Sequence, residues 1–456
     1  MTIKRRQFLQ FATAAAVAPS LADALTKRAD ASPVAPDPND PNDPNAITDL
    51  DHEIGKPYRG WKEGELDLHF IHTGVGENMF YIMPDGTTAL VDTGDRDAAH
   101  YKDGVAILPD DARRPGEWVA RYISRLRPDL KRIDYVMASH FHSDHIGSDR
   151  FGAGMKGLEG DKDYQISGIS HVGEFYEFGT AFDRGYPDYS RPTPWAPGGR
   201  ENLVKFWNYA EEKLGLKREK FEVGALDQLK LVNAPEKYDF HVRNICANGV
   251  VWGGEGKENV DYFERYPANK ETNKNENTRS IAFVMRYGAF RFYSGGDASG
   301  VILDENGESV GFEDAVGRAT GPVDVCKANH HTFKDATTKG FVNAVAPRVF
   351  VVCVWSKSHL QDVTASNMCD ETATGYPGPR LVCPTAIHPA NAEMMKDKSW
   401  RRRLVEIGGH VVVKVLDDGA KYKVYYLTSQ DESMNVELVF GPFDSTGTAR
   451  AARRES

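Results

Sequence analysis

Residues 139–147 read SHFHSDHIG, which places three histidines and one aspartate within six positions. The stretch follows IDYVMA, an apolar run typical of a buried strand, although the whole chain contains only 14 histidines. In this H-x-H-x-D-H pattern, the alternate side chains of His140 and His142 can point toward one metal ion. Asp144 and His145 follow a turn and can reach a second ion nearby. A lone histidine is usually a structural residue, but such a cluster predicts a metal site.

Four other polar residues also follow predicted strands. Asp92 lies at the end of the strand pair NMFYIMPDGTTALVDTGD, and Asp297 ends the strand pair TRSIAFVMRYGAFRFYSGGD. His330 and His331 follow the strand in GPVDVCKANHH. Strands alternate with helices, one of them predicted over residues 115–127, which indicates a layered α/β fold. Because strand ends converge at one edge of such folds, we expect these residues to join the histidine cluster.

The composition and charge of the 456-residue chain narrow its class. Hydrophobic residues make up 40% and charged residues 27%, as in ordinary soluble globular proteins, and the length allows two or three domains. The formal net charge of −10 argues against a stable nucleic-acid partner, because an acidic protein is not attracted to phosphate backbones. No apolar run reaches the roughly 18 residues that a membrane span requires, so we expect no transmembrane segment in the mature chain.

The N-terminus has the pattern of an export signal followed by a linker. Residues 1–24 combine KRRQFL, a short apolar run and an A-x-A site, which resembles a cleaved bacterial twin-arginine signal. Residues 25–64 form a linker rich in Pro, Asn and Asp. We expect one main domain over residues 65–440, including a C-terminal hairpin, and a tail at 441–456. The twin-arginine export machinery is then a partner, and the protein is periplasmic or secreted.

The five cysteines are too few and too scattered for a disulfide framework or a cysteine-based zinc site. Cys369 and Cys383 flank a Gly/Pro-containing loop, and an oxidising compartment would allow a bridge between them. Two free buried thiols are an equally good interpretation of this spacing.

The motif HFHSDH resembles the signature of the metallo-β-lactamase-fold hydrolases, and agreement in order and strand context extends from residue 65 to residue 354. The resemblance implies an α/β fold, the four-layer αββα sandwich of the metallo-β-lactamase type, with loop insertions. Asp92 in VDTG looks like the family's aspartate that orients the histidine loop. Asp297 looks like the aspartate that bridges two metals, and His331 looks like the last histidine ligand.

The chain departs from the family pattern at two places. IHTGVGENMFYIMPDG and CKANHH resemble the branch of the hydrolase domain of bacterial DNA-uptake competence proteins, but Thr-Phe replaces the Gly-Ser that usually follows the two histidines. His330 therefore stays an alternative ligand to His331. Many members also have another histidine between the cluster and the bridging aspartate. Here only His171 and His241 lie in that interval, and His171 is the candidate ligand, with Asp183 as an alternative oxygen donor.

These assignments imply an exported hydrolase with two divalent metal ions, with zinc favoured and manganese or iron as alternatives. The predicted ligands are His140, His142, Asp144, His145, Asp297 and His331, with His330 and His171 as further candidates. A hydroxide held between two such ions is the nucleophile in this class, and the resemblance assigns catalytic roles to Asp144 and Asp92.

The expected substrate is a small molecule with a phosphodiester or phosphate ester bond. A lactone or β-lactam ring is the alternative substrate. Two other classes remain open: an iron-dependent redox enzyme of the same fold and a non-catalytic metal-binding module. Di-iron members resemble H-x-E-x-D at the cluster, whereas this chain has His142 in the glutamate position.

Overall fold

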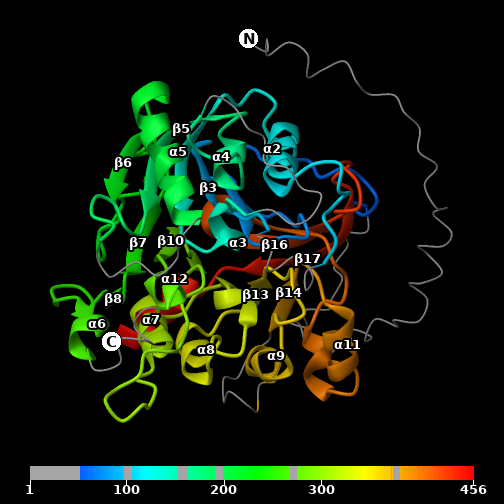
Figure 1. Ribbon diagram of the computed structural model, residues 1–456. Helices are drawn as coiled ribbons and strands as arrows, with labels where there is room; N and C mark the ends of the chain where they lie inside the picture. Colours follow the sequence, from blue (N-terminus) through cyan, green and yellow to red (C-terminus); the bar gives the residue numbers. More distant parts are fainter. Residues whose placement is uncertain are drawn as a thin grey trace.

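The computed structural model describes residues 52–96, 105–150, 162–190, 199–267, 275–370, 372 and 380–455 (Figure 1). Two mixed β-sheets form its centre, one of nine strands in the order β17-β16-β15-β1-β2-β3-β4-β5-β6 and one of eight in the order β14-β13-β12-β11-β10-β7-β8-β9. The strands of the first sheet are β1 Leu66–Phe70, β2 Asn78–Ile82, β3 Thr88–Thr93, β4 Arg132–Ala138, β5 Glu177–Asp183, β6 Lys217–Lys220, β15 His410–Leu416, β16 Lys421–Leu427 and β17 Val436–Asp444. Those of the second are β7 Phe240–Ala247, β8 Val250–Val251, β9 Val260–Asp261, β10 Ala282–Tyr287, β11 Phe290–Ser294, β12 Val325–Lys327, β13 Val349–Val352 and β14 Leu381–Pro384.

The two sheets pack face to face through a shared apolar core. Alternate residues of the central strands point into this core, as period-2 strands require. The ring of Phe292 lies 6.1 Å from the ring of Phe70 and 5.7 Å from the ring of Tyr81, so that side chains of both sheets meet directly. Strands β3, β4, β5 and β6 run parallel, as do β11, β12, β13 and β14. The parallel strands bring their carboxyl ends to a common edge.

Helices cover the outer face of each sheet (Figure 1). The outer face of the first sheet packs against α2 Pro115–Leu126, α4 Ile169–Val172 and α5 Gly199–Leu214. The outer face of the second sheet packs against α7 Phe312–Thr320, α8 Lys339–Val345, α9 Asp362–Cys369 and α11 Pro389–Met395. The remaining helical segments are α3 Ser143–Ile146, α6 Tyr262–Arg265, α12 Gly447–Glu455 and the 3-10 turns Glu276–Arg279, Asn329–Thr332, Ser399–Arg403 and Asp417–Gly419. The expected four-layer αββα sandwich is confirmed.

Several expectations about the chain can be compared with this structure. The helix predicted over residues 115–127 is α2, and the C-terminal hairpin is the antiparallel pair β15 and β16. The five cysteines are all free and buried, so the structure has no bridge between Cys369 and Cys383. Among the described residues, no helix combines the length and apolar character needed to cross a lipid bilayer.

The predicted signal at residues 1–24, like most of the linker at 25–64, lies outside the described residues. The described fold continues beyond the expected domain of residues 65–440 at both ends. Gly55 N–H donates to the Val436 carbonyl at 2.8 Å, which ties the end of the linker to β17. The expected tail at 441–456 holds the end of β17 and helix α12, because pairing with β16 carries β17 to Asp444.

Candidate metal centre

The predicted site residues meet at the edge where β3, β4, β11 and β12 end. Strand β4 leads into the loop with His140 and His142 and then into α3, which contains Asp144 and His145. Strand β11 is followed within a few residues by Asp297, and β12 is followed by the turn that contains His330 and His331. The expected convergence of strand ends is therefore what brings these side chains together.

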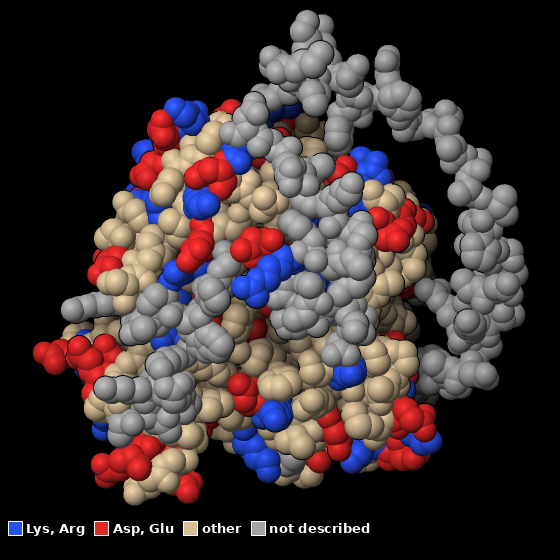
Figure 2. Space-filling view, viewed as in Figure 1, with Lys and Arg blue, Asp and Glu red and all other residues tan. Residues whose placement is uncertain are grey.

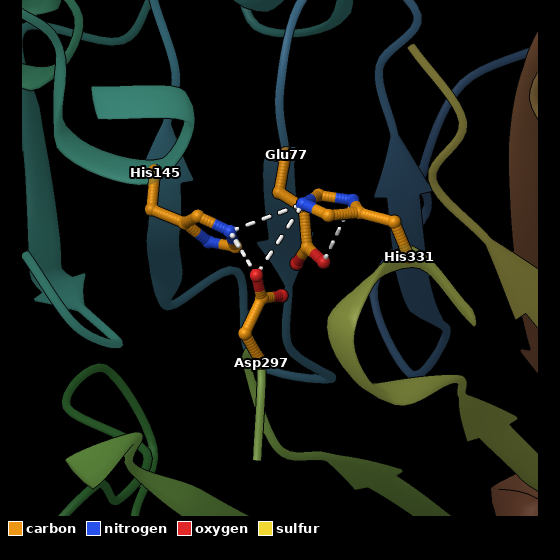
Figure 3. Close-up of side chains that lie close together, drawn as sticks. All are labelled: Glu77, His145, Asp297 and His331. Carbon is orange, nitrogen blue, oxygen red and sulfur yellow. Dashed lines mark hydrogen bonds and ion pairs between the residues drawn. The ribbon is translucent and has the colours of Figure 1, made fainter. Parts of the chain in front are cut away.

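One group of possible ligands contains Glu77, His145, Asp297 and His331, each with one ligand atom within 4.8 Å of the others (Figure 3). His145 Nε2 lies 3.2 Å from Asp297 Oδ2 and 3.3 Å from His331 Nε2. Asp144 adds a second carboxylate, since its Oδ2 lies 3.1 Å from His331 Nε2. Figure 3 shows the side chains of Glu77, His145, Asp297 and His331 directed toward a common point. The geometry suits one cation held by imidazole nitrogen and carboxylate oxygen.

A second group contains His140, His142 and Asp297. His140 Nε2 lies 3.1 Å from His142 Nδ1 and 3.8 Å from Asp297 Oδ2. His330 also approaches this group, with its Nε2 3.8 Å from Asp297 Oδ2. Asp297 is therefore common to both groups, and its Oδ2 faces histidines from each of them.

Oxygen acceptors hold the far ring nitrogen of three histidines. Asp92 Oδ2 lies 2.8 Å from His145 Nδ1, and Asp335 Oδ1 lies 2.6 Å from His330 Nδ1. The backbone carbonyl of Cys353 lies 2.8 Å from Nδ1 of His331. Such partners fix ring orientation and leave the other nitrogen free to bind a cation, as in known metal sites.

Asp92 also organises the backbone of the histidine loop. Its carboxylate accepts from the backbone N–H of Ser139 at 2.7 Å and from the Ser139 hydroxyl at 2.6 Å. Asp92 itself has φ +58°, in the left-handed region that residues other than glycine seldom adopt. The strained backbone at this position points its carboxylate toward the loop, which agrees with an orienting role.

The electrostatics of the cluster favour charged carboxylates. Burial opposes the ionisation of Asp297, but the His145 and His331 side chains outweigh burial and hold the pKa of Asp297 well below its usual range. Burial opposes protonation of His145, but Asp297, Asp144 and Asp92 raise the pKa of His145 well above its usual value. Burial also lowers the pKa of His140 far below the usual value, and His145 adds to this effect. These shifts favour a protonated, cationic His145 between carboxylates and a neutral His140, and a metal cation at this site would take the place of the His145 proton.

The residues present fit a pair of divalent cations. Asp297 Oδ1 is buried and has no hydrogen-bond partner among the described residues, and the same holds for one carboxylate oxygen, Oε2, of Glu77. A buried carboxylate oxygen without a partner is costly unless a cation or a donor occupies the space beside it. Imidazole and carboxylate ligands are those that zinc, manganese and iron accept.

Two other candidates of the sequence do not reach the cluster. His171 lies on α4, its ring is 5.9 Å from the ring of Phe175, and burial together with Arg114 lowers its pKa to about 3. His171 belongs to neither group of possible ligands. Asp183 accepts three hydrogen bonds from its own loop, two from backbone N–H groups and one from Tyr189 at 2.7 Å.

Three residues at the centre, Glu77, Lys327 and His359, were not predicted from the sequence because they lie outside the histidine motif. Glu77 precedes β2 and pairs with Lys327, the last residue of β12, and both side chains are fully buried. The ring of His359 stacks on the ring of His331 at 4.4 Å with an angle of 12°. Charged residues next to predicted buried strands would have been the only hint for Glu77 and Lys327.

Comparison with known proteins supports part of the resemblance. Residues 72–150 match the family model Lactamase_B, described as the metallo-beta-lactamase superfamily. This segment contains Asp92 and the histidine cluster and ends before Asp297. No curated protein matches the chain. The branch that resembles the competence proteins stays a prediction.

Among solved structures, the chain is similar to a mutant of the CmlA beta-hydroxylase, with 11% sequence identity and a TM-score of 0.36. The match covers 72% of this chain and 53% of that one, so the chain spans about half the length of that protein.

Proposed function

We propose that this protein is a metal-dependent hydrolase with a dinuclear centre bridged by Asp297. One observation carries the proposal: Asp297 Oδ2 lies within 3.8 Å of histidine nitrogens from both groups of possible ligands. A carboxylate shared in this way is the part that a two-cation hydrolase requires. A site for a single structural cation would need no ligand common to two groups.

The proposed ligands divide into two sets around Asp297. His140 and His142 hold the first cation, with His330 as the third histidine of that set, because its Nε2 faces Asp297 and Asp335 holds its other ring nitrogen. Asp144, His145 and His331 hold the second cation. Zinc is the favoured metal, with manganese and iron as alternatives. When bound, the two cations would supply Lewis acidity and lower the pKa of water toward neutrality.

The protein residues contribute orientation and proton transfer. Asp144 is 9% exposed, whereas His140, His145 and Asp297 are at most 1% exposed, so Asp144 lies at the more accessible side of the cluster. Its carboxylate is therefore placed to accept a proton during attack on a substrate. Asp92 keeps Nε2 of His145 directed at the cluster through its contact with Nδ1. Full burial of His140, His145, Asp297 and His331 keeps bulk water away from these four ligands.

The proposed substrate is a small molecule with a phosphodiester or phosphate ester bond. The resemblance of the motifs to the competence branch favours phosphate chemistry. The net charge of −10 disfavours long nucleic acids. Figure 2 agrees with this, because basic and acidic side chains of the described residues are intermixed on the face it shows. A lactone or β-lactam ring is the alternative.

Screening the purified full chain tests the function. Bis(p-nitrophenyl) phosphate, a simple lactone and a chromogenic β-lactam would be compared before and after removal of metal with a chelator. We expect turnover of the phosphodiester, its loss in chelator and its return with zinc or manganese. Turnover of only the lactone or β-lactam would change the substrate class but keep the centre. Chelator-insensitive turnover by protein without transition metal would contradict the proposal.

The resemblance of residues 1–24 to a twin-arginine signal leads us to place this hydrolase in the periplasm or outside the cell. Export in the folded state would allow the cations to be loaded before the protein leaves the cytoplasm.

A further inference from the structure

We propose that Glu77 and Lys327 form a buried positioning pair at the metal centre. Lys327 holds the turn that presents Asp297, and Glu77 cancels the charge of the ammonium group so that cations can bind beside it. The inference rests on the proposed dinuclear centre and adds two residues that lie outside the histidine pattern.

Lys327 supports the backbone of the bridging aspartate. Its side chain is 0% exposed, and its Nζ donates to the carbonyl oxygen of Gly296 at 2.5 Å and lies 4.0 Å from Asp297 Oδ1. The N–H of His330 donates to the same carbonyl at 3.3 Å. Gly296 has φ +51°, and a Cβ there would lie 2.7 Å from the hydroxyl oxygen of Ser139. The turn is therefore held by Lys327 on one side and pressed against the histidine loop on the other.

Glu77 connects Lys327 to the other half of the cluster. Its N–H donates to the carbonyl of Asp144 at 2.9 Å, and its own carbonyl accepts from the N–H of Gly94 at 3.0 Å. Its carboxylate pairs with Lys327 and lies 3.5 Å from Nδ1 of His331 (Figure 3). Glu77 lies immediately before β2 of the first sheet and Lys327 ends β12 of the second, so the pair links the two sheets at the site.

The two charges have opposite consequences for a cation. An unpaired ammonium so close to Asp297 would repel a divalent cation through a poorly screened interior. An unpaired Glu77 carboxylate would attract one, because it is among the four residues whose ligand atoms lie within 4.8 Å of one another. Buried ion pairs often add little net stability compared with apolar residues, so packing alone does not account for this pair. Removal of one charge at a time should therefore shift metal affinity in opposite directions.

Titration with Zn²⁺ alone tests the inference. Wild type, Glu77→Gln, Lys327→Met and the double variant would be stripped of metal as full chains and titrated against a chromophoric chelator. We expect Glu77→Gln to weaken Zn²⁺ binding at least about tenfold, because the ammonium loses its counter-charge. The double variant should bind at least about threefold more tightly than Glu77→Gln, since neither charge remains, but it should stay weaker than wild type because the turn has lost its support from Lys327. Lys327→Met keeps the carboxylate and should bind at least about threefold more tightly than the double variant.

The absorption spectrum of each variant loaded with Co²⁺ gives a second measurement, independent of turnover. Loss of Lys327 frees the turn before Asp297 and so changes the position of this ligand. The ligand-field bands of Lys327→Met should therefore shift relative to those of wild type. Unchanged bands in this variant would overturn the positioning role of Lys327.

The remote pair of Asp67 and Lys414 provides the matched control. Both side chains are also fully buried, with Lys414 Nζ 2.6 Å from Asp67 Oδ1, but they belong to β1 and β15. Asp67→Asn should lower the free energy of unfolding and leave Zn²⁺ affinity unchanged. A comparable loss of affinity in Asp67→Asn and Glu77→Gln would reduce the role of Glu77 to general stability.

Three outcomes would overturn the inference: a double variant that binds Zn²⁺ no better than Glu77→Gln, equal losses in all variants, or equal affinity of Lys327→Met and the double variant. The comparison of Lys327→Met with the double variant remains decisive if Glu77→Gln does not fold. Failure of wild type to bind Zn²⁺ would refute the dinuclear centre itself, whereas normal binding by wild type without these contrasts would refute only the pair.

Discussion

Asp92 and His145 contact one another through Oδ2 and Nδ1 at 2.8 Å, and this contact decides which ring nitrogen of His145 faces the cluster. The opposite nitrogen, Nε2, lies 3.2 Å from Asp297. Two aspartates therefore act on the same imidazole from opposite sides. Asp92 orients the ring from behind, and Asp297 shares the space in front of the ring where a cation would bind.

These positions predict different outcomes for two similar substitutions. Asp297→Asn removes the carboxylate common to both ligand groups, so we expect turnover to fall by several orders of magnitude with loss of at least one metal ion. Asp92→Asn keeps every proposed ligand and disturbs only ring orientation, which typically reduces activity or metal affinity about 10–100-fold. Turnover and elemental analysis of both variants measure the difference.

The melting temperature of the metal-free forms serves as the control for that comparison. Both variants should melt close to the metal-free wild type, since the amide preserves size and one oxygen. If Asp297→Asn keeps both metals and most of its turnover while Asp92→Asn loses both, the bridge has been assigned to the wrong aspartate.

The third histidine of the first ligand set provides another prediction. We expect His330→Ala to reduce the metal content of the purified protein from about two ions per chain toward one. His330 faces Asp297 and is held by Asp335, whereas His171 belongs to neither ligand group. His171→Ala should therefore keep both ions, which makes it the matched control. Loss of an ion in His171→Ala, with none lost in His330→Ala, would transfer the role to His171.

The site residues whose position follows from strand topology can be predicted from the sequence. Asp92 is the second-last residue of β3, Asp297 and the clustered histidines follow β11 and β4, and the carboxyl ends of neighbouring parallel strands meet at one edge. The alternative between His330 and His331 could not be resolved, because both lie in the left-handed region, at φ +45° and +47°, which no strand pattern predicts. In the structure both face Asp297, at 3.8 Å and 3.5 Å.

Side-chain contacts between the two sheets could not be predicted from the sequence. Glu77 and Lys327 lie 250 positions apart, and their pairing depends on how the sheets stack. His359 reaches His331 only because a loop after β13 folds back over the cluster. Periodicity describes which face of a strand is buried, but it contains no information about which charged residue of another sheet lies opposite.

The proposed export signal gives a prediction that depends on residues 1–24 alone. Replacing Arg5 and Arg6 with lysine should leave the precursor in the cytoplasm, because the twin-arginine machinery recognises the arginine pair. Fractionation of cells that express either form, followed by immunoblotting, measures the distribution. The substitutions preserve charge, so a general effect of a basic N-terminus would leave export unchanged. Periplasmic accumulation of the lysine form at the normal level would rule out this signal.

The last prediction concerns acid stability and the buried pair of Asp67 and Lys414. Burial opposes the ionisation of Asp67, but the Lys414 ammonium at 2.6 Å and the His69 side chain together outweigh burial and lower the pKa of Asp67 to about 2. Because this pKa lies below the ordinary value of 3.8, the folded state favours the ionised carboxylate. The resulting stabilisation is complete above about pH 5 and is lost as the pH falls toward 2.

A pKa lowered to about 2 corresponds to roughly 2 kcal/mol of stability at neutral pH, of which about 1 kcal/mol should be lost by pH 3. Urea denaturation of wild type and Asp67→Asn at pH 6 and pH 3 measures the contribution of the Asp67 charge to the free energy of unfolding. At pH 6 the variant should be less stable by about 2–3 kcal/mol, because within the described part of the chain Lys414 keeps only Glu65, at 2.8 Å, as a carboxylate partner. The difference between the two proteins should shrink by about 1 kcal/mol at pH 3, where protonation has begun to remove the same charge from wild type. A difference that stays constant across this range would mean that Asp67 stabilises the sheet by its shape and hydrogen bonds and not by its charge.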